Sequence, residues 1–318
     1  MPEPLVSILI PAYNRAALIG ETLASVALQS YKHWECIVVD DGSTDATVAV
    51  VQSYCDKDAR FKLYHRPENR PKGGNAARNY ALEMSRGEYV NWFDSDDLME
   101  KHFIQNKLAV FLNNAEVDFV VSKSVNFYAD GRQEPIGYYG FNDSLALTAD
   151  HFIQEQVHWI TDDLFIKRSK IGAVRFDESL LSGQEFNFCA QLLSHNSLNG
   201  VFINSILSYR RIHLGSIQES LKQNELLAFK RKYIVAQKTF KSVYTRLTDA
   251  SEVFFINRIL KLATALLRNR VYPPSYLNFL YLYTKSCGLA KGTCLVCYSI
   301  LLVMGMDSYR MGKIIKAS

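Results

Sequence analysis

The most constraining feature of the sequence is an alternation of short apolar runs and helical segments over its first hundred residues. Between the apolar runs, apolar side chains recur at helical spacing over 15–30, 46–51 and 75–84. Repeated strand–helix–strand units predict an α/β fold, a Rossmann-like, mostly parallel sheet with helices on both faces. The predicted strands are the apolar runs 6–10, 36–39, 61–64 and 88–93.

After this regular part the pattern changes twice. From about 110 to 217 it loosens into loops, with strands expected at 118–122 and 164–166 and a helix after Gly183. From about 220 onward the spacing of apolar residues is helical almost throughout. We therefore predict a first domain over 1–218 and a basic helical C-terminal region over 219–318.

The formal net charge of +4 hides an uneven distribution of charge. Residues 1–220 sum to −8 and residues 221–318 sum to +12. The total is too small to indicate nucleic acid, but the asymmetry indicates a partner for the basic region. One candidate partner is an anionic membrane surface. The alternative is that the region forms a helical cap or a dimer interface, with its Lys and Arg side chains simply solvated. The oligomeric state is left open.

Other features bear on the compartment and on the class of site. The acidic N-terminus has no leader pattern and the six cysteines are scattered, which predicts a cytoplasmic protein with reduced thiols. The apolar stretch 294–306 is shorter than the roughly 20 residues that a bilayer-spanning helix needs. Cys294 and Cys297 lack a second pair or a nearby His, which argues against zinc. The sequence contains neither a dinucleotide fingerprint nor a Walker loop, which argues against a dehydrogenase or P-loop kinase.

Polar clusters follow three of the predicted strands, at 11–15, 40–43 and 94–97. Ligands of open parallel sheets bind beyond the carboxyl ends of the strands, so these clusters are expected to line one site. Asp94 and Asp96 offer hard oxygen atoms that suit Mn²⁺ or Mg²⁺. Lys72 and Arg78 could complete a cradle for a pyrophosphate group.

These segments, in this order and spacing, resemble family 2 glycosyltransferases of the bacterial surface-polysaccharide type, which have the GT-A fold of nucleotide-diphospho-sugar transferases. The resemblance covers about 1–217 and is most specific over roughly the first 115 residues. It is carried by Val6–Asn14, Val38–Asp45, Ala77–Asn79, Gly87–Val90 and Asp94–Asp97.

The resemblance implies roles at the donor site. Tyr13 would stack on the nucleotide base beside the backbone of Pro11 and Ala12, and Asp41 would bind the base edge. The alternative for Tyr13 is a packing aromatic, and Asp40 is expected to be only a turn residue. Further contacts to the donor would come from Lys72, Arg78, Asp94, Ser95 and Arg211.

The resemblance also implies a metal site and a general base. Asp96 and Asp94 would bind the metal, and His213 could join them, the alternative being a structural histidine. The general base would be Glu185, in a segment where Gln184 replaces the usual acid. The alternative role for Glu185 is that of a charge that stabilises the start of a helix.

The sequence thus predicts an inverting, metal-dependent glycosyltransferase. It would move a sugar from a nucleotide-diphosphate donor, expected to be UDP-linked, to a saccharide or lipid-linked acceptor in cell-surface polysaccharide synthesis. It would work in the cytoplasm, with its basic region at the inner face of the membrane. The alternative is a catalytically silent sugar-nucleotide-binding or scaffold protein on the same fold. A nucleotidyltransferase would need a different phosphate loop after the first strand.

Overall fold

The computed structural model describes residues 3–136, 145–213 and 224–316, and the chain divides into two compact units. The first comprises Met1–Ser179 and Asn196–Leu214, and the second comprises Leu180–His195 and Gly215–Ser318. The predicted domain boundary at 218 lies outside the described residues.

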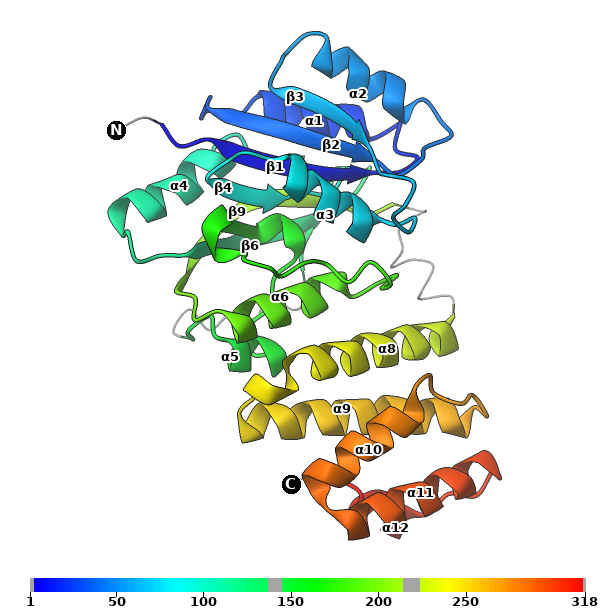
Figure 1. The fold of residues 1–318 in the computed structure, drawn as a ribbon. Coiled ribbons are helices and arrows are strands. Elements are labelled where there is room, and N and C mark those ends of the chain that lie inside the picture. Colours follow the sequence, from blue (N-terminus) through cyan, green and yellow to red (C-terminus); the bar gives the residue numbers. More distant parts are fainter. Residues whose placement is uncertain (1–2, 137–144, 214–223, 317–318) are drawn as a thin grey trace. The chain divides into compact units, whose positions relative to one another are not determined.

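The first unit is built on a sheet in which four neighbouring strands at one end of the strand order are parallel (Figure 1). β1 and β2 are buried along their whole length, as expected for strands covered on both faces. The register pairs Ala12 with Asp40, so the loops that follow these two strands start side by side. The parallel strands, in sheet order, are β3 (Phe61–His65), β2 (Trp34–Asp40), β1 (Val6–Ala12) and β4 (Tyr89–Trp92).

Beyond β4 the sheet becomes mixed, because β8 runs antiparallel to β4 and to β6, whereas β6 and β9 are parallel. The predicted strands at 118–122 and 164–166 are confirmed within β6 and β8; β9 was not predicted. The sheet continues from β4 with β8 (Leu164–Lys167), β6 (Phe119–Phe127), β9 (Gly200–Arg211) and β5 (Leu98–Met99), and β7 (Gln133–Pro135) pairs with β6.

Helices cover both faces of this sheet. Val6, Ile8 and Ile10 of β1 share one core cluster with side chains of α1 (Ile19–Ala27), α2 (Thr47–Cys55) and the unpredicted α4 (Phe103–Asn113). The alternate residues of β1 point to the other face, where α3 (Gly74–Met84) packs with small buried residues such as Ala77 and Ala81. The α/β prediction is therefore confirmed. Shorter elements of the unit are α5 (Ala149–Ile153), η1 (Thr161–Asp163) and η2 (Arg168–Lys170).

The described part of the second unit is helical, which confirms the predicted helical C-terminal region. Phe255 lies at its core, 5.7 Å from Phe240 and 6.0 Å from Phe186 between ring centres. Its elements are α6 (Gln184–His195), α8 (Glu225–Val243), η3 (Tyr244–Arg246), α9 (Asp249–Arg268), α10 (Tyr276–Cys287), α11 (Leu289–Val303) and α12 (Tyr309–Ile314). Within the described ranges, none of the helices has both the length and the apolar character needed to cross a membrane.

Candidate active site

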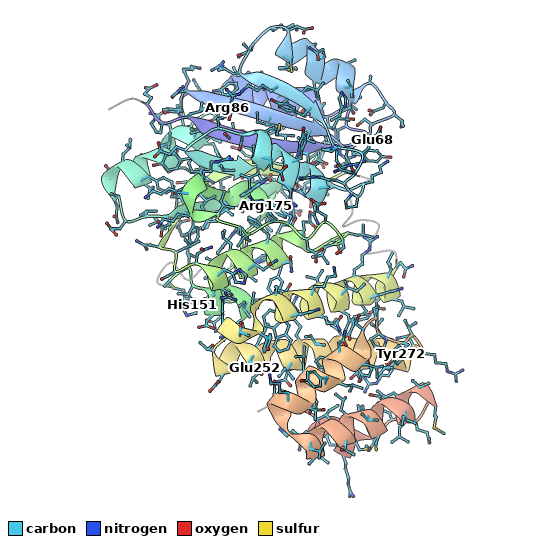
Figure 2. The ribbon with its side chains drawn as sticks, in the orientation of Figure 1. Glu68, Arg86, His151, Arg175, Glu252 and Tyr272 are labelled. Atoms are coloured by element: carbon cyan, nitrogen blue, oxygen red, sulfur yellow. The ribbon has the colours of Figure 1, made fainter. Side chains whose placement is uncertain are left out.

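The three predicted loops meet at the carboxyl end of the parallel strands. Figure 2 shows Glu68, which follows β3, at this end of the sheet, and Arg86, which precedes β4, at the opposite end. Asn14 joins the first two loops, because its backbone N–H donates to Ser43 Oγ (2.9 Å) and its Oδ1 accepts from the Thr44 N–H (2.8 Å). Arg15 Nε reaches Asp96 Oδ2 at 3.2 Å and so joins the first loop to the third. The expectation that the three clusters share one edge is confirmed.

Tyr13 and Lys72 form one side of the site. The Tyr13 side chain is 40% exposed, so it is not a packing aromatic of the core. Lys72 Nζ lies 4.0 Å from the centre of its ring, a cation–π contact. Pro11 and Ala12 are the buried last residues of β1, which fixes the backbone beside this ring. An exposed aromatic face next to a cation suits a planar base followed by phosphate groups.

Asp41 is 4% exposed and sits directly after β2, with its N–H donating to Ala12 O at 2.8 Å. Its carboxylate accepts a hydrogen bond from Nε of Arg66, a residue that the sequence did not single out. Asp40 accepts from the N–H groups of Gly42 (3.0 Å) and Ser43 (3.1 Å), which confirms that it is a turn residue.

In the loop after β4, the side chains of Asp94 and Asp96 have different partners. Arg78, which is 6% exposed, donates from Nη2 to Asp94 Oδ1 at 2.6 Å. Asp96 Oδ2 contacts Arg15 Nε and, at 2.9 Å, Nε2 of His213. The structure thus brings Asp96 and His213, two predicted metal ligands, into direct contact. Ser95, between Asp94 and Asp96, is buried, and its carbonyl accepts a hydrogen bond from Thr22 Oγ1 at 3.1 Å.

Arg211, a predicted phosphate contact, supports the same loop from the end of β9. Its N–H donates to Asp97 Oδ1 and its Nε to the carbonyl of Asp96, both at 2.8 Å. A further nitrogen, Nη2, pairs with Glu21 Oε2 at 2.7 Å. These partners are protein groups, so a contact of Arg211 with phosphate stays a prediction.

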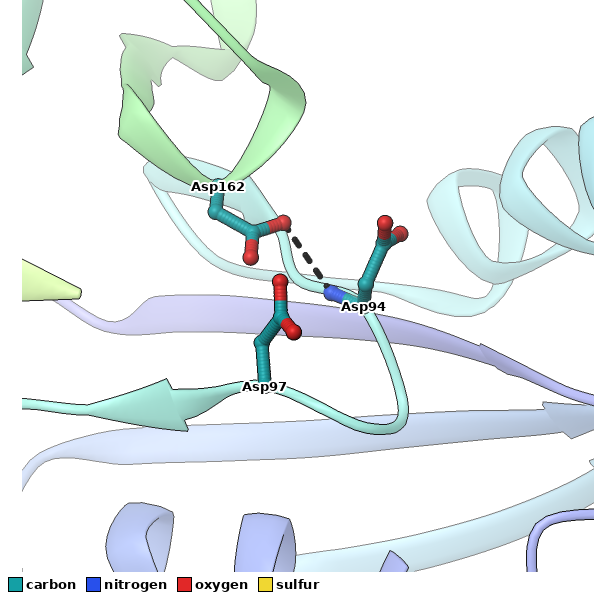
Figure 3. Close-up of side chains that lie close together, drawn as sticks. All are labelled: Asp94, Asp97 and Asp162. Carbon is teal, nitrogen blue, oxygen red and sulfur yellow. Dashed lines mark hydrogen bonds between the residues drawn. The ribbon is translucent and has the colours of Figure 1, made fainter. Parts of the chain in front are cut away.

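Two aspartates of this loop, Asp94 and Asp97, form a group of three carboxylates with Asp162 (Figure 3). One oxygen of each lies within 4.8 Å of the others, and Asp97 and Asp162 are only 3% and 1% exposed. Asp162 Oδ1 accepts from the Asp94 N–H at 3.1 Å, whereas its buried Oδ2 has no partner among the described residues other than the neighbouring carboxyl group of Asp97.

Burial, and then the charge of a neighbouring aspartate, raise the pKa of both Asp97 and Asp162 well above the usual value for an aspartic acid. Carboxylates this close are stable only when they share protons or face a cation. Buried carboxylate oxygens gathered in this way are hard donors, which fit Mg²⁺ or Mn²⁺ in chemistry. The residues present therefore fit a divalent cation at this end of the site.

The turn that carries Asp162 is held from the core. Asn91 of β4 donates to the carbonyls of Asp162 (2.9 Å) and Leu164 (2.8 Å), and Lys107 of α4 donates from Nζ to Asp163 O. Ser124 Oγ donates to the Asp163 carboxylate at 2.6 Å. Sequence reasoning missed Asp162 because it lies 65 residues after Asp97 in a segment without a motif.

Glu185, the predicted base, lies in the first turn of α6, in the second unit. Gln184, the residue that replaces the usual acid, donates from Nε2 to Glu185 Oε1 at 3.1 Å. The carboxylates described above belong to the first unit. The role of Glu185 as a general base stays a prediction.

Comparisons with known proteins give the family to which this fold and strand-end site belong. The sequence profile of glycosyl transferase family 2 matches residues 7–170, so the chain belongs to this family. An uncharacterized glycosyltransferase of Haemophilus influenzae is 39% identical over 114 residues, 36% of this chain and 45% of that protein. The putative teichuronic acid biosynthesis glycosyltransferase TuaG of Bacillus subtilis is 41% identical over 113 residues, 36% of this chain and 44% of that protein. These matches span under half the length of those relatives.

Two solved structures share the fold at low sequence identity. S. aureus TarS 1–349 in complex with UDP-GlcNAc aligns with a TM-score of 0.66 and 20% identity over 96% of this chain and 92% of that one. The mannosyltransferase PcManGT from Pyrobaculum calidifontis, in complex with GDP-Man and Mn²⁺, aligns with a TM-score of 0.57 and 16% identity over 98% and 83%. The predicted GT-A fold is confirmed.

Proposed function

We propose that the protein is an inverting, metal-dependent glycosyltransferase that moves a sugar from a nucleotide-diphosphate donor, UDP-linked, to a saccharide or lipid-linked acceptor. The observation that carries this proposal is the joining of the three strand-end loops through Asn14, Arg15 and Asp96. Those loops combine an exposed aromatic ring, a buried carboxylate beside it, cations and an acidic group. These groups match the chemistry of a nucleotide base, of a diphosphate and of a divalent cation, respectively: a ring and an acceptor for the base, cations for the diphosphate, and an acidic group for the metal.

Each residue has a task in donor binding. Tyr13 stacks on the base and Asp41 accepts a hydrogen bond from its edge. Lys72 and Arg78 offset the charge of the diphosphate. Carboxylates of the 94–97 loop and Asp162, with the neighbouring His213, would hold Mn²⁺ or Mg²⁺, which when bound would supply positive charge to stabilise the departing nucleoside diphosphate.

Glu185 removes the proton from the acceptor hydroxyl during transfer. The acceptor oxygen forms a bond to the anomeric carbon as the bond from that carbon to the diphosphate oxygen breaks. A single displacement of this kind inverts the anomeric configuration. A glutamate within reach of the hydroxyl serves as the general base.

The names of the relatives and the distribution of charge along the chain support a setting at the membrane. TuaG is named for teichuronic acid biosynthesis, and TarS 1–349 is in complex with UDP-GlcNAc, which supports UDP-sugars and cell-surface polysaccharide for this chain. Residues 221–318 carry the +12 charge. On α11, the side chains of Leu289, Val296, Ile300 and Val303 are exposed and recur at helical spacing on one face. We infer that the protein works in the cytoplasm and contacts the anionic inner face of the membrane through this unit.

Two variants separate transfer from silent binding. Mn²⁺-dependent hydrolysis and thermal stabilisation are measured for a panel of nucleotide sugars, with EDTA as the control. Asp96→Ala is expected to lose both effects, whereas Glu185→Gln is expected to keep the thermal stabilisation by the donor and lose hydrolysis. A fully active Asp96→Ala would refute the mechanism. A wild-type protein that binds the donor but never turns it over would favour the scaffold alternative.

Vesicle flotation tests the membrane contact. The Val296→Glu/Ile300→Glu double variant of the full chain is expected to bind phosphatidylglycerol-containing vesicles less than the wild type. Leu112→Glu, at a 73% exposed leucine of the first unit, is the matched control and is expected to bind as the wild type does. Equal partitioning of all three proteins would remove the membrane proposal.

A further inference from the structure

We propose that Arg66 is a positioning residue that sets the base preference of the site by holding Asp41 as a fixed hydrogen-bond acceptor. The inference rests on the proposed function, because it assumes that Asp41 meets the base. It assigns a role to a side chain outside the family motifs quoted above. Its grounds are the contacts of two neighbouring strand ends and the hydrogen-bonding chemistry of the bases.

The backbone brings the two residues together. Asp41 follows β2 and Arg66 follows β3, and the Arg66 N–H donates to Asp40 O at 2.9 Å, which continues the β2–β3 pairing by one residue. The Asp41 N–H is bound to Ala12 O on the other side, so the backbone of Asp41 is fixed by both neighbouring strands. The two side chains therefore meet at the carboxyl end of the sheet, the end marked by Glu68 in Figure 2.

The guanidinium of Arg66 is itself held in place. Its side chain is 14% exposed, and its Nη1 donates to the carbonyls of Pro67 (3.0 Å) and Arg70. Its Nε donates to Asp41 Oδ1. A planar group bound at three acceptors cannot rotate freely, so it fixes the plane and direction of the carboxylate that it contacts.

The other carboxylate oxygen of Asp41 is left to act as an acceptor. No side chain or backbone group among the described residues donates a hydrogen bond to Asp41 Oδ2. An ionised carboxylate only accepts hydrogen bonds. Uracil presents an N–H at N3, whereas cytosine presents a bare ring nitrogen there and has its edge donor, the 4-amino group, beside it. A carboxylate whose direction is fixed toward N3 therefore meets a donor in uracil and a lone pair in cytosine. The pair Arg66–Asp41 therefore favours uracil over cytosine.

The role of Arg66 predicts a selective loss. Without the guanidinium, the buried carboxylate loses both its orientation and its compensating charge. UDP uses the Asp41 acceptor and is expected to bind roughly tenfold to a hundredfold more weakly to Arg66→Gln, as for a lost hydrogen bond to a charged group. CDP gains little from Asp41, so its dissociation constant is expected to change much less. The ratio of the two dissociation constants should therefore move toward one.

The experiment is calorimetric titration of UDP and of CDP, with Mn²⁺, into the full-length wild type, Arg66→Gln, Arg66→Lys and Arg70→Gln. Arg70→Gln is the matched control, because Arg70 lies in the same loop but pairs with Glu83 at 2.8 Å. It is expected to keep the wild-type ratio. Arg66→Lys retains the charge and tests the geometry if Arg66→Gln does not fold. In the Asp41→Asn background, Arg66→Gln should have little further effect on the ratio.

The outcomes separate this inference from the proposed function. If Arg66→Gln weakens UDP and CDP by the same factor, or neither, Arg66 does not set the base preference, although the nucleotide site stands. If the wild type binds UDP and CDP equally, Asp41 does not read the base and the inference is overturned. If the wild type binds neither nucleotide, both the proposed function and this inference are overturned.

Discussion

Asp162→Asn is expected to stabilise the metal-free protein, although it changes a side chain at the centre of the site. Asp97 and Asp162 are almost fully buried, with carboxylate oxygens within 4.8 Å. Two unit charges at that separation repel by about 3 kcal/mol at an effective dielectric constant of about 20. The folded protein reduces this cost by retaining a proton, so we expect a gain of about 1–3 kcal/mol on substitution. An asparagine could keep an oxygen toward the Asp94 N–H and donate to Asp97.

The assay is thermal unfolding with EDTA and with Mn²⁺. For a domain of this size the gain corresponds to a rise in Tm of several degrees. Asp130→Asn, at an exposed aspartate paired with Arg132, is the control and should leave Tm unchanged. Mn²⁺ is expected to raise the Tm of the wild type more than that of Asp162→Asn. A variant that unfolds at or below the wild-type Tm in EDTA would refute the repulsion argument.

The pH dependence follows from the raised pKa values of Asp97 and Asp162. A folded-state pKa above the unfolded value means that the folded protein holds protons that the unfolded chain gives up above about pH 4. This contribution to stability is therefore lost as the pH rises. The difference in stability between Asp162→Asn and the wild type should be small at pH 5 and larger at pH 8; a difference that shrinks as the pH rises would contradict the assignment.

Other predictions concern the packing around the site. Burial lowers the pKa of Lys107 to about 7, so the unfolded chain binds more protons between pH 7 and about 10, and this group should make wild-type stability rise with pH in that window. Urea unfolding at pH 7, 8 and 9 should give a smaller rise for Lys107→Met, and equal slopes would contradict the assignment. Gly183 has a φ of +65°, and a methyl group there would lie 3.0 Å from Val235 Cγ2. Gly183→Ala should therefore lower Tm by more than Gly172→Ala, where φ is +57° but the space is open and the strain alone costs about 1 kcal/mol; equal losses would show that the Val235 contact is unimportant.

Sequence reasoning predicted the parts of the fold that rest on local patterns. The strands at 6–10 and 36–39 are continuous apolar runs, and polar residues follow them at once, so both the sheet and its functional edge could be predicted. The 12-residue strand β9 was missed because its side chains alternate irregularly and its middle is exposed. Its pairing with β6 is fixed by tertiary contacts that a local pattern does not contain.

The site was predictable where one loop supplies the chemistry. Asp94 and Asp96 stand in a motif, and their contacts with Arg78 and His213 agree with a shared site. Asp162 could not be found, because only the fold brings the turn before β8 next to the loop after β4. Arg66 could not be found for the same reason, because its contact with Asp41 depends on the pairing of β2 with β3 and not on its neighbours in the sequence.

The central claim is that the joined strand-end loops form one cation-dependent site for a nucleotide diphosphate. Its most direct test is calorimetric titration of UDP into the wild type with Mn²⁺, the wild type with EDTA, and Asp96→Ala with Mn²⁺. We predict that UDP binds in the first case and that binding is lost or greatly weakened in the other two. Equal affinity for UDP in all three experiments would contradict the account.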